Sequence, residues 1–403
     1  LVIRNTSNRF KKIESEREYQ HKSNQIKQNF LRNIFIKIFR NKYIRVQKIY
    51  GFNFFDHLFF SALLHFKKPM KLKNEQQDSD EEIIEDLSFV PIEEIFNLTI
   101  PSSLENFSTN IKKRQRKFIP NKILLGSQQI RSDDEYRTTL ALALESGEKV
   151  IGCQHGGDDY GLSLHCEEIN DNEFSQFGFI TWGWENHSKY KKNFIRLPSP
   201  YLHKFYNKHT QKNENLILIG SDMNQTNRFL SARPTQKQWY EHLDKQLFLI
   251  KNLKGKEIEI SYRPHPKNSG SIPAEQYLIS KIPNLKIQYG ELHQKIFISK
   301  CIILDHPGTT LNISMISNTP TILFWDEKYF PLEDSAAGIL DEFKSNSMFF
   351  SDEKKLATFI KDTNIPEWWA SSRIQELRNK FVNNYSYSSF SWRKAWVNYF
   401  KNL

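Results

Sequence analysis

Short apolar runs alternate with amphipathic segments from about residue 118 to residue 325. The short runs end at glycine, proline or acidic residues, as buried β-strands do, whereas the longer segments have the spacing of helices. The first of these helices is expected to stop at Gly147, because glycine favours a helix end. The predicted strands are 121–127, 149–155, 177–184, 215–222, 256–266, 285–290, 301–307 and 319–325, and the predicted helices are 133–147, 235–252, 292–300 and 308–318. This alternation predicts α/β layers built on parallel sheets.

The chain has 403 residues, more than one hydrophobic core usually organises, so two domains are expected. The break between them is predicted at residues 197–215, which are polar and interrupted by proline. The fold class expected is α/β, with two Rossmann-type domains and a cleft between them. The predicted domains are 1–205, which carries a basic helical arm, 206–384, and a C-terminal aromatic helix at 385–403.

The helix predicted at the end of the chain carries a stripe of aromatic residues with i, i+4, i+7, i+8 spacing. The stripe consists of Trp392, Trp396, Tyr399 and Phe400. Such stripes usually pack against the rest of the fold, and we favour that interpretation. The alternative is an interfacial contact with a membrane, since Arg393, Lys394 and Lys401 lie beside the stripe.

The net charge of +11 is concentrated at the start of the chain. Residues 1–50 contain thirteen Lys and Arg but three Glu, and apolar residues are interspersed among them. Such an arm can pack as a solvated helical face on its own domain or lie on an anionic membrane surface. Nucleic acid is a weaker alternative, because no nucleic-acid-binding module signature accompanies the charge.

The remaining bulk properties favour a cytoplasmic protein, peripheral at the inner membrane. No run of about 18 uncharged apolar residues is present, so no membrane span is expected. The start of the chain lacks the apolar core of a signal peptide, and it lacks an initiator Met, which favours a module of a longer protein. Three cysteines in a chain of this length form no disulfide framework.

Two polar clusters follow predicted strands in the second half of the chain, 263-RPHPK-267 and 305-DHPGTTLN-312. Ligands of open α/β sheets bind at the carboxyl ends of strands, and backbone N–H groups at a helix start bind anions. Taken singly, these residues are equally typical of turns and helix caps. Together they predict a nucleotide phosphate site, although no GxGxxG or GxxxxGK[ST] motif is present. The predicted ligand-binding residues are Arg263, His265, Lys267, Gly308, Thr309 and Thr310.

The first half supplies the loop 154-QHGGDDYG-161 and several carboxylates that can face this phosphate site. A carboxylate opposite a phosphate pocket is what glycosyl transfer requires, as nucleophile or base at the anomeric carbon. The candidates are Asp158, Asp159, Glu167 and Glu168, together with Asp222, which ends a predicted strand at the domain junction. A zinc site is the alternative for this region, but its spacing matches no common site, so no metal is predicted. Its ligands would be Cys153, His155, His165 and Cys166.

The order of motifs resembles transferases of bacterial surface-carbohydrate biosynthesis related to the retaining β-Kdo glycosyltransferases of capsule and O-antigen assembly. The resemblance covers about residues 118–330. It rests on motifs spaced along that region, with two aspartates here between the paired glycines and Tyr160. These motifs are 154-QHGGDDYG-161, 180-ITWGW-184, 198-PSP-200, 263-RPHP-266 and 305-DHPGTT-310.

This resemblance implies a GT-B-like fold and transfer of Kdo from CMP-Kdo to a lipid-linked glycan, without a metal or other cofactor. Retention by double displacement requires a carboxylate nucleophile, for which we favour Asp222, then Glu168, with His155 positioning or deprotonating the acceptor hydroxyl. The alternatives are a CDP-glycerol-type phosphotransferase or an inverting sialyl-like transferase. An alternative of another class is a non-catalytic module that binds polysaccharide or membrane.

Overall fold

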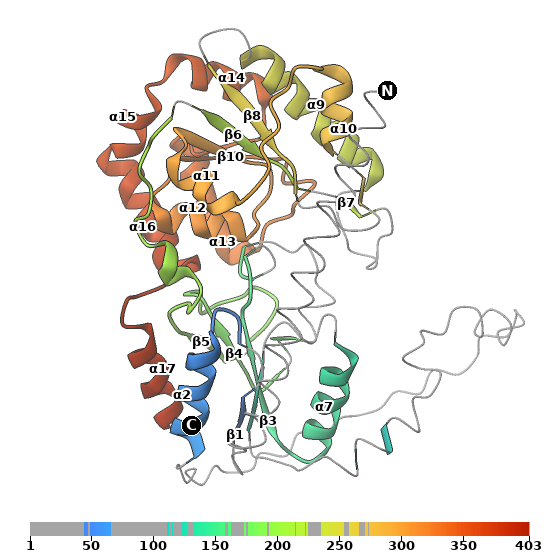
Figure 1. Ribbon diagram of the computed structural model, residues 1–403, viewed down its shortest axis with the longest axis vertical. Coiled ribbons are helices and arrows are strands. Elements are labelled where there is room, and N and C mark those ends of the chain that lie inside the picture. Colours follow the sequence, from blue (N-terminus) through green and yellow to red (C-terminus); the bar gives the residue numbers. More distant parts are fainter. Residues whose placement is uncertain are drawn as a thin grey trace, which may run out of the picture.

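The computed structural model describes most of the chain from residue 133 onward and shorter pieces before it. The described residues are 44–46, 49–65, 111–112, 115, 123–126, 133–157, 160–162, 173–174, 176–191, 193–213, 215–221, 223–224, 235–253, 258–265, 271–272 and 274–402. The basic N-terminal arm therefore falls largely outside them. Two parallel sheets with helices on their faces form two Rossmann-like domains, as the sequence predicted (Figure 1).

The N-terminal sheet has its strands in chain order, and every neighbouring pair is parallel. The strands are β1 (Ile44–Val46), β2 (Ile123–Leu125), β3 (Lys149–Cys153), β4 (Gly178–Thr181) and β5 (Phe194–Arg196). Helix α7 (Asp134–Glu145) joins β2 to β3, and its end agrees with the prediction, because Gly147 adopts a φ of 75° after the cap.

Alternate residues of the N-terminal strands feed two separate cores, as side-chain alternation in a strand requires. Leu124 and Val150 pack with α7 on one face of the sheet. The intervening strand residues pack on the other face with α2 (Phe54–His65) and α17 (Trp392–Asn402). In Figure 1 these two helices lie on the side of the sheet opposite to α7.

The C-terminal sheet has the order β12-β11-β10-β6-β8, and its neighbouring strands are all parallel. The bounds are β6 (Leu216–Ile219), β8 (Ile260–Arg263), β10 (Cys301–Leu304), β11 (Thr321–Phe324) and β12 (Phe349–Phe350). Because the chain leaves β6 for β8 on one side and later forms β10 on the other, the order reverses between β6 and β10. Ligands of open α/β sheets bind at the carboxyl ends of strands at such a reversal.

Two helical layers cover this sheet. One core joins alternate strand residues to α9 (Gln236–Leu253), α10 (Ala274–Lys281) and α14 (Glu353–Asp362). The other side carries α11 (Leu292–Ile298), α12 (Thr309–Ser317), α13 (Asp334–Ser345) and α16 (Ser372–Tyr385). The segment 285–290, predicted as a strand, makes only an isolated bridge between Ile287 and Tyr262. The short strands β7 (Met223–Asn224) and β9 (Ser271–Ile272) pair antiparallel, η1 (Leu202–Phe205) follows β5, and α15 (Ile365–Ala370) precedes α16.

The two domains share a continuous core rather than a single linker. One hydrophobic cluster includes Trp182 and Trp184 of the first domain and Leu311 and Phe381 of the second. The predicted boundary at residue 205 falls within the segment between β5 and β6, and the chain crosses back after α16. The backbone N–H of Tyr387 donates to the Trp182 carbonyl at 2.8 Å on that return.

Helix α17 fixes the end of the second domain's chain onto the first domain. Trp392, Trp396 and Phe400 are buried against the N-terminal sheet and α2, and Tyr399 packs beside them. The indole Nε1 of Trp396 donates to the Pro198 carbonyl at 2.9 Å. The aromatic stripe read from the sequence is therefore packed against the fold.

Replacement of Trp396 by alanine is expected to lower the free energy of unfolding by about 3–5 kcal/mol, because it leaves a large cavity between α17 and the sheet. Urea unfolding followed by far-UV circular dichroism measures the change. Lys394→Ala, at an exposed position of the same helix, is the matched control and should shift it by less than about 0.5 kcal/mol. Equal effects of the two changes would contradict the packing role.

Candidate functional site

Gln154 joins two of the sequence motifs. It follows β3, where its side chain Oε1 accepts hydrogen bonds from the Trp182 backbone N–H at 2.8 Å and from Trp184 Nε1 at 2.9 Å. Its Nε2 donates to the Gly156 carbonyl at 2.7 Å. One buried amide thus fixes the QHGG loop and the TWGW segment against each other. This places His155 at the carboxyl end of β3.

His155 belongs to a buried chain of hydrogen bonds that ends on a carboxylate. Its Nε2 contacts the Tyr160 hydroxyl, and that hydroxyl donates to Glu173 Oε2 at 2.7 Å. The imidazole Nε2 also lies 3.6 Å from Glu173 Oε1. All three side chains are at least nine-tenths buried, so the carboxylate acts on the imidazole with little screening from water.

The direction of this chain sets the tautomer of His155. Tyr160 has a single hydroxyl proton, which it donates to Glu173. The hydrogen bond between Tyr160 and His155 must then be donated by Nε2. In the neutral ring the basic lone pair is therefore on Nδ1. An imidazole oriented by a carboxylate can accept a proton from a hydroxyl group and stabilise the charge that results.

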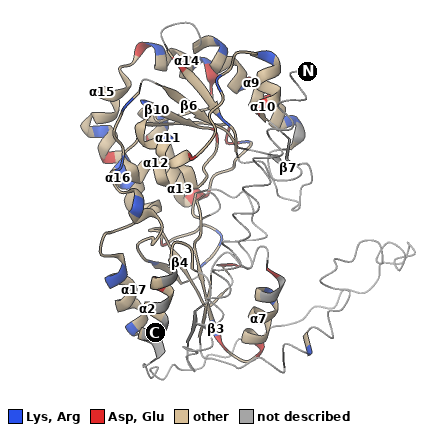
Figure 2. Ribbon diagram, viewed as in Figure 1, with Lys and Arg blue, Asp and Glu red and all other residues tan. Residues whose placement is uncertain are grey.

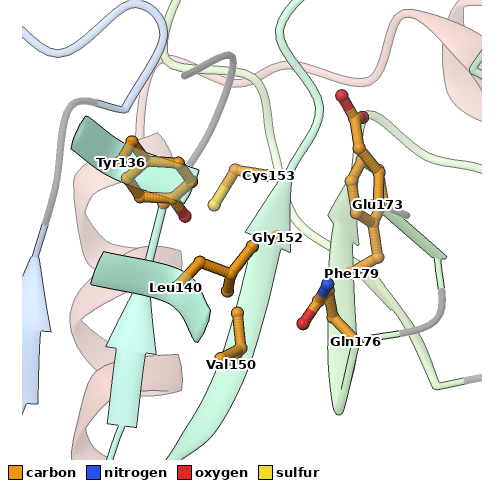
Figure 3. A pocket seen from close by; sticks show the side chains of 9 residues that line it. Tyr136, Leu140, Val150, Gly152, Cys153, Glu173, Gln176 and Phe179 are labelled. Carbon is orange, nitrogen blue, oxygen red and sulfur yellow. The ribbon is translucent and has the colours of Figure 1, made fainter. Parts of the chain in front are cut away.

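A small cavity lies beside Glu173, at the carboxyl ends of β2 and β3. Figure 3 shows Tyr136 and Cys153 on one side of it and Phe179 and Gln176 on the other, with the Glu173 carboxylate at its upper edge. Burial raises the pKa values of the Cys153 thiol and the Tyr136 phenol, so both side chains are neutral at pH 7. Glu173 is the acidic residue among those that line this cavity.

The QHGG loop reaches the second domain at the start of α12. The backbone N–H of Gly157 donates to Thr309 Oγ1 at 3.0 Å. A Cβ placed on Gly157 would lie 2.2 Å from Asn312 Oδ1 and 2.9 Å from the Gly308 carbonyl carbon. Only glycine permits this approach, so the contact between the domains requires a glycine at residue 157.

The sheet reversal between β6 and β10 holds a buried carboxylate, Asp305. It accepts hydrogen bonds from the Ser221 backbone N–H at 2.8 Å, from Gln246 Nε2 at 2.8 Å, and from His242 and His306 at 3.1 Å and 2.7 Å. Burial alone would raise the pKa of Asp305, but the hydrogen bonds from both histidines outweigh it and hold the pKa well below its ordinary value. Asp305 is therefore ionised at neutral pH.

His306 extends from Asp305 to the first turn of α12. Its Nδ1 bonds to the carboxylate, and its Nε2 lies beside Gly308, where an added Cβ would be 2.4 Å away. Gly308 is the N-cap residue of α12 and supplies no side-chain cap. The first N–H groups of this helix, with Thr309, Thr310 and the His306 imidazole, form an arrangement suited to an anion.

Two of the other predicted phosphate residues are described, and both are at the end of β8, next to β6. Arg263 is buried and its NH1 donates to the Gln288 carbonyl at 3.0 Å, which ties it to the chain after α10. His265 is exposed just beyond the end of β8. The structure brings Gly308 and Thr309 together with the His155 loop, whereas Arg263 is engaged with the backbone.

Six of the candidate catalytic and ligand-binding residues fall outside the described part of the chain, and their roles stay predictions. These residues are Asp158, Asp159, Glu167, Glu168, Asp222 and Lys267. His165 and Cys166 of the alternative zinc set are also outside it. Within the described ranges, no group of three or more His, Cys, Asp or Glu side chains is arranged to hold a metal ion.

Sequence reasoning missed Glu173 and the roles of Asp305, His306, His242 and Gln246. Glu173 directly precedes the aromatic Phe174, and this apolar neighbour is the local signal for a segment that is buried in the structure. Asp305 directly follows a fully apolar strand, which is a comparable signal. The residues on α9 gave no signal, because only the packing of α9 on the sheet brings them to Asp305.

These features define a two-domain α/β protein with polar groups from both domains gathered at one edge of the second sheet. The chain belongs to a family of transferases: residues 2–400 match the model of the LIC12162 family transferases. A search of curated proteins found no match.

Solved structures with a similar arrangement are distant in sequence. A Staphylococcus aureus TarM variant, in complex with Fondaparinux, alpha-GlcNAc-glycerol and UDP, is 13% identical with a TM-score of 0.40, over 69% of this chain and 55% of that one. S. aureus MnaA with UDP is 10% identical, with a TM-score of 0.43 and coverages of 75% and 80%. The wall teichoic acid polymerase TagF is 14% identical, with a TM-score of 0.37 and coverages of 72% and 83%. This chain thus spans about half the length of TarM.

The helices of the described ranges include none that is long and apolar enough to cross a membrane.

Asp305→Asn is expected to lower the free energy of unfolding at pH 7 by about 3 kcal/mol or more, because it removes a buried charge that several donors face. The folded-state pKa of Asp305 is depressed below its ordinary value of 3.8, so its contribution is complete above that value and is lost as pH falls below it. The difference between wild type and variant should therefore shrink from about pH 4 downward. Urea unfolding at a series of pH values measures it.

The matched control for this prediction is Asp362→Asn, at an exposed position at the end of α14. It should change stability little at any pH. A gap between Asp305→Asn and wild type that stays constant down to pH 2 would contradict the depressed pKa.

Proposed function

We propose that this transferase is a glycosyltransferase of bacterial surface polysaccharide biosynthesis, which moves Kdo from CMP-Kdo to a lipid-linked glycan without a metal ion. The observation that carries the proposal is the contact between Gly157 and Thr309. It brings the loop with His155, from one domain, to the uncapped start of α12 in the other. The choice of donor rests on the motif resemblance.

The second domain would bind the cytidine nucleotide. The phosphate of the nucleotide would accept hydrogen bonds from the first N–H groups of α12 and from the hydroxyls of Thr309 and Thr310. His306 Nε2 lies at the same turn. Asp305, ionised and buried, would keep the His306 ring in position beside the anion. His265, Arg263 and Lys267 would approach the phosphate from the end of β8.

The first domain would bind the acceptor and carry the base. With retention, the carboxylate of Asp222 attacks the anomeric carbon and CMP leaves; Glu168 is the second candidate for this nucleophile. The acceptor hydroxyl then attacks the same carbon, the carboxylate leaves, and His155 takes the hydroxyl proton. Glu173, through Tyr160, would stabilise the imidazolium that forms.

CMP is expected to raise the melting temperature of the protein more than CDP, UMP or GDP, because the phosphate site is matched to a cytidine monophosphate donor.

His265→Ala should weaken CMP binding about tenfold or more, since it removes a charge-assisted hydrogen bond. Isothermal titration calorimetry measures the affinity. Absence of binding by all four nucleotides would instead support a non-catalytic module, and preference for CDP a CDP-glycerol-type phosphotransferase.

Asp222→Asn is expected to abolish transfer while CMP binding stays as in wild type, because an amide is a poor nucleophile. Glu173→Gln should lower the transfer rate by about 100-fold with CMP affinity unchanged, because the base loses its orienting charge. Transfer from CMP-Kdo to a lipid-linked acceptor is measured by chromatography of the product. Full activity of Asp222→Asn would remove that residue as the nucleophile, and an inverted product would favour the sialyl-like mechanism.

A further inference from the structure

Two segments far apart in sequence pack together and carry basic but no acidic side chains. Residues 198–213 and 386–402 contain six Lys and Arg side chains and no Asp or Glu. All six are exposed. They are Lys204, Lys208, Lys212, Arg393, Lys394 and Lys401. In Figure 2, Lys and Arg positions colour parts of the α17 ribbon blue at the edge of the molecule.

The two segments are packed together by specific contacts. The ring of His203 lies 5.5 Å from that of Trp392, and Ser388 Oγ donates to the Ser199 carbonyl at 2.8 Å. Two acidic residues lie beside these segments. Asp56 on α2 is buried and paired with Arg393 at 2.7 Å, and Glu291, just before α11, is close enough to act on Tyr201. The basic side chains of the two segments outnumber these two acidic neighbours.

Two aromatic rings project from the middle of this basic surface. Phe390, between α16 and α17, is 78% exposed, and Tyr206, just after η1, is 39% exposed. Their ring centroids are 5.4 Å apart in an edge-on arrangement. A phenylalanine this exposed costs free energy in water, and the two rings meet on the outside of the fold rather than in a core.

We infer that this basic–aromatic surface, formed by residues 198–213 and 386–402, docks on a bilayer containing anionic lipids. Phenylalanine and tyrosine rings partition into the interface between headgroups and acyl chains, and lysines are attracted to anionic headgroups. A second copy of the same surface would repel this one, because basic side chains are in excess on both. The inference does not depend on which group the protein transfers.

The test uses the full chain and vesicles of phosphatidylcholine, with or without about one third phosphatidylglycerol. Sedimentation should show binding to the anionic vesicles and little to the neutral ones. The Lys204→Gln/Lys208→Gln double variant should bind the anionic vesicles about 25-fold more weakly, since each lysine near the membrane contributes roughly fivefold. Phe390→Ala should weaken binding roughly tenfold by removing the inserted ring.

A matched control is the Lys354→Gln/Lys355→Gln double variant, which removes the same charge from exposed positions on α14. It should bind the anionic vesicles like wild type. CMP binding is measured for every variant as well. It tests the proposed function independently of vesicle binding, and a variant that binds CMP like wild type is folded. Equal loss in both double variants would overturn the inference, because only net charge would then matter. Unchanged binding of Phe390→Ala would also overturn it, in favour of a surface for soluble polyanions.

Discussion

The backbone of the QHGG loop lies so close to the start of α12 that no side chain fits between them. The hydrogen bond from Gly157 to Thr309 and the contact of Gly157 with Gly308 and Asn312 set the distance between the two domains at this edge. This contact sets how far His155, in the first domain, lies from the start of α12 in the second. A β-carbon at residue 157 would separate the base in one domain from the anion site in the other.

Each side of this contact is organised by a buried carboxylate that orients imidazole rings. Glu173 acts on His155 through Tyr160, and Asp305 holds His306 and His242. A buried carboxylate stays ionised only when enough donors face it, so the donors around Asp305 are part of what the fold must build. The two domains thus reach the same chemical arrangement from different elements of structure.

Much of the fold could be predicted because strands buried on both faces read as continuous apolar runs. The strands at 149–153 and 301–304 were found for that reason, and so was the aromatic stripe of α17. The segment 285–290 was predicted wrongly, since it forms only one bridge beside β8, and its alternating residues do not show how many partners a strand will have. The strand β12, which is two residues long, was too short to give a pattern.

The sequence by itself determined the α/β class, the two parallel sheets and the motifs at the ends of their strands, because hydrophobic periodicity and glycine positions are local properties of the chain. Only the tertiary structure decided which polar groups meet. Glu173 reaches His155 although it lies 18 residues later in the chain, and His242 and Gln246 reach Asp305 from α9. Tyr206 meets Phe390, which is 184 residues later in the chain. Such pairs depend on how helices and loops pack on a sheet, and local sequence patterns contain no record of that packing.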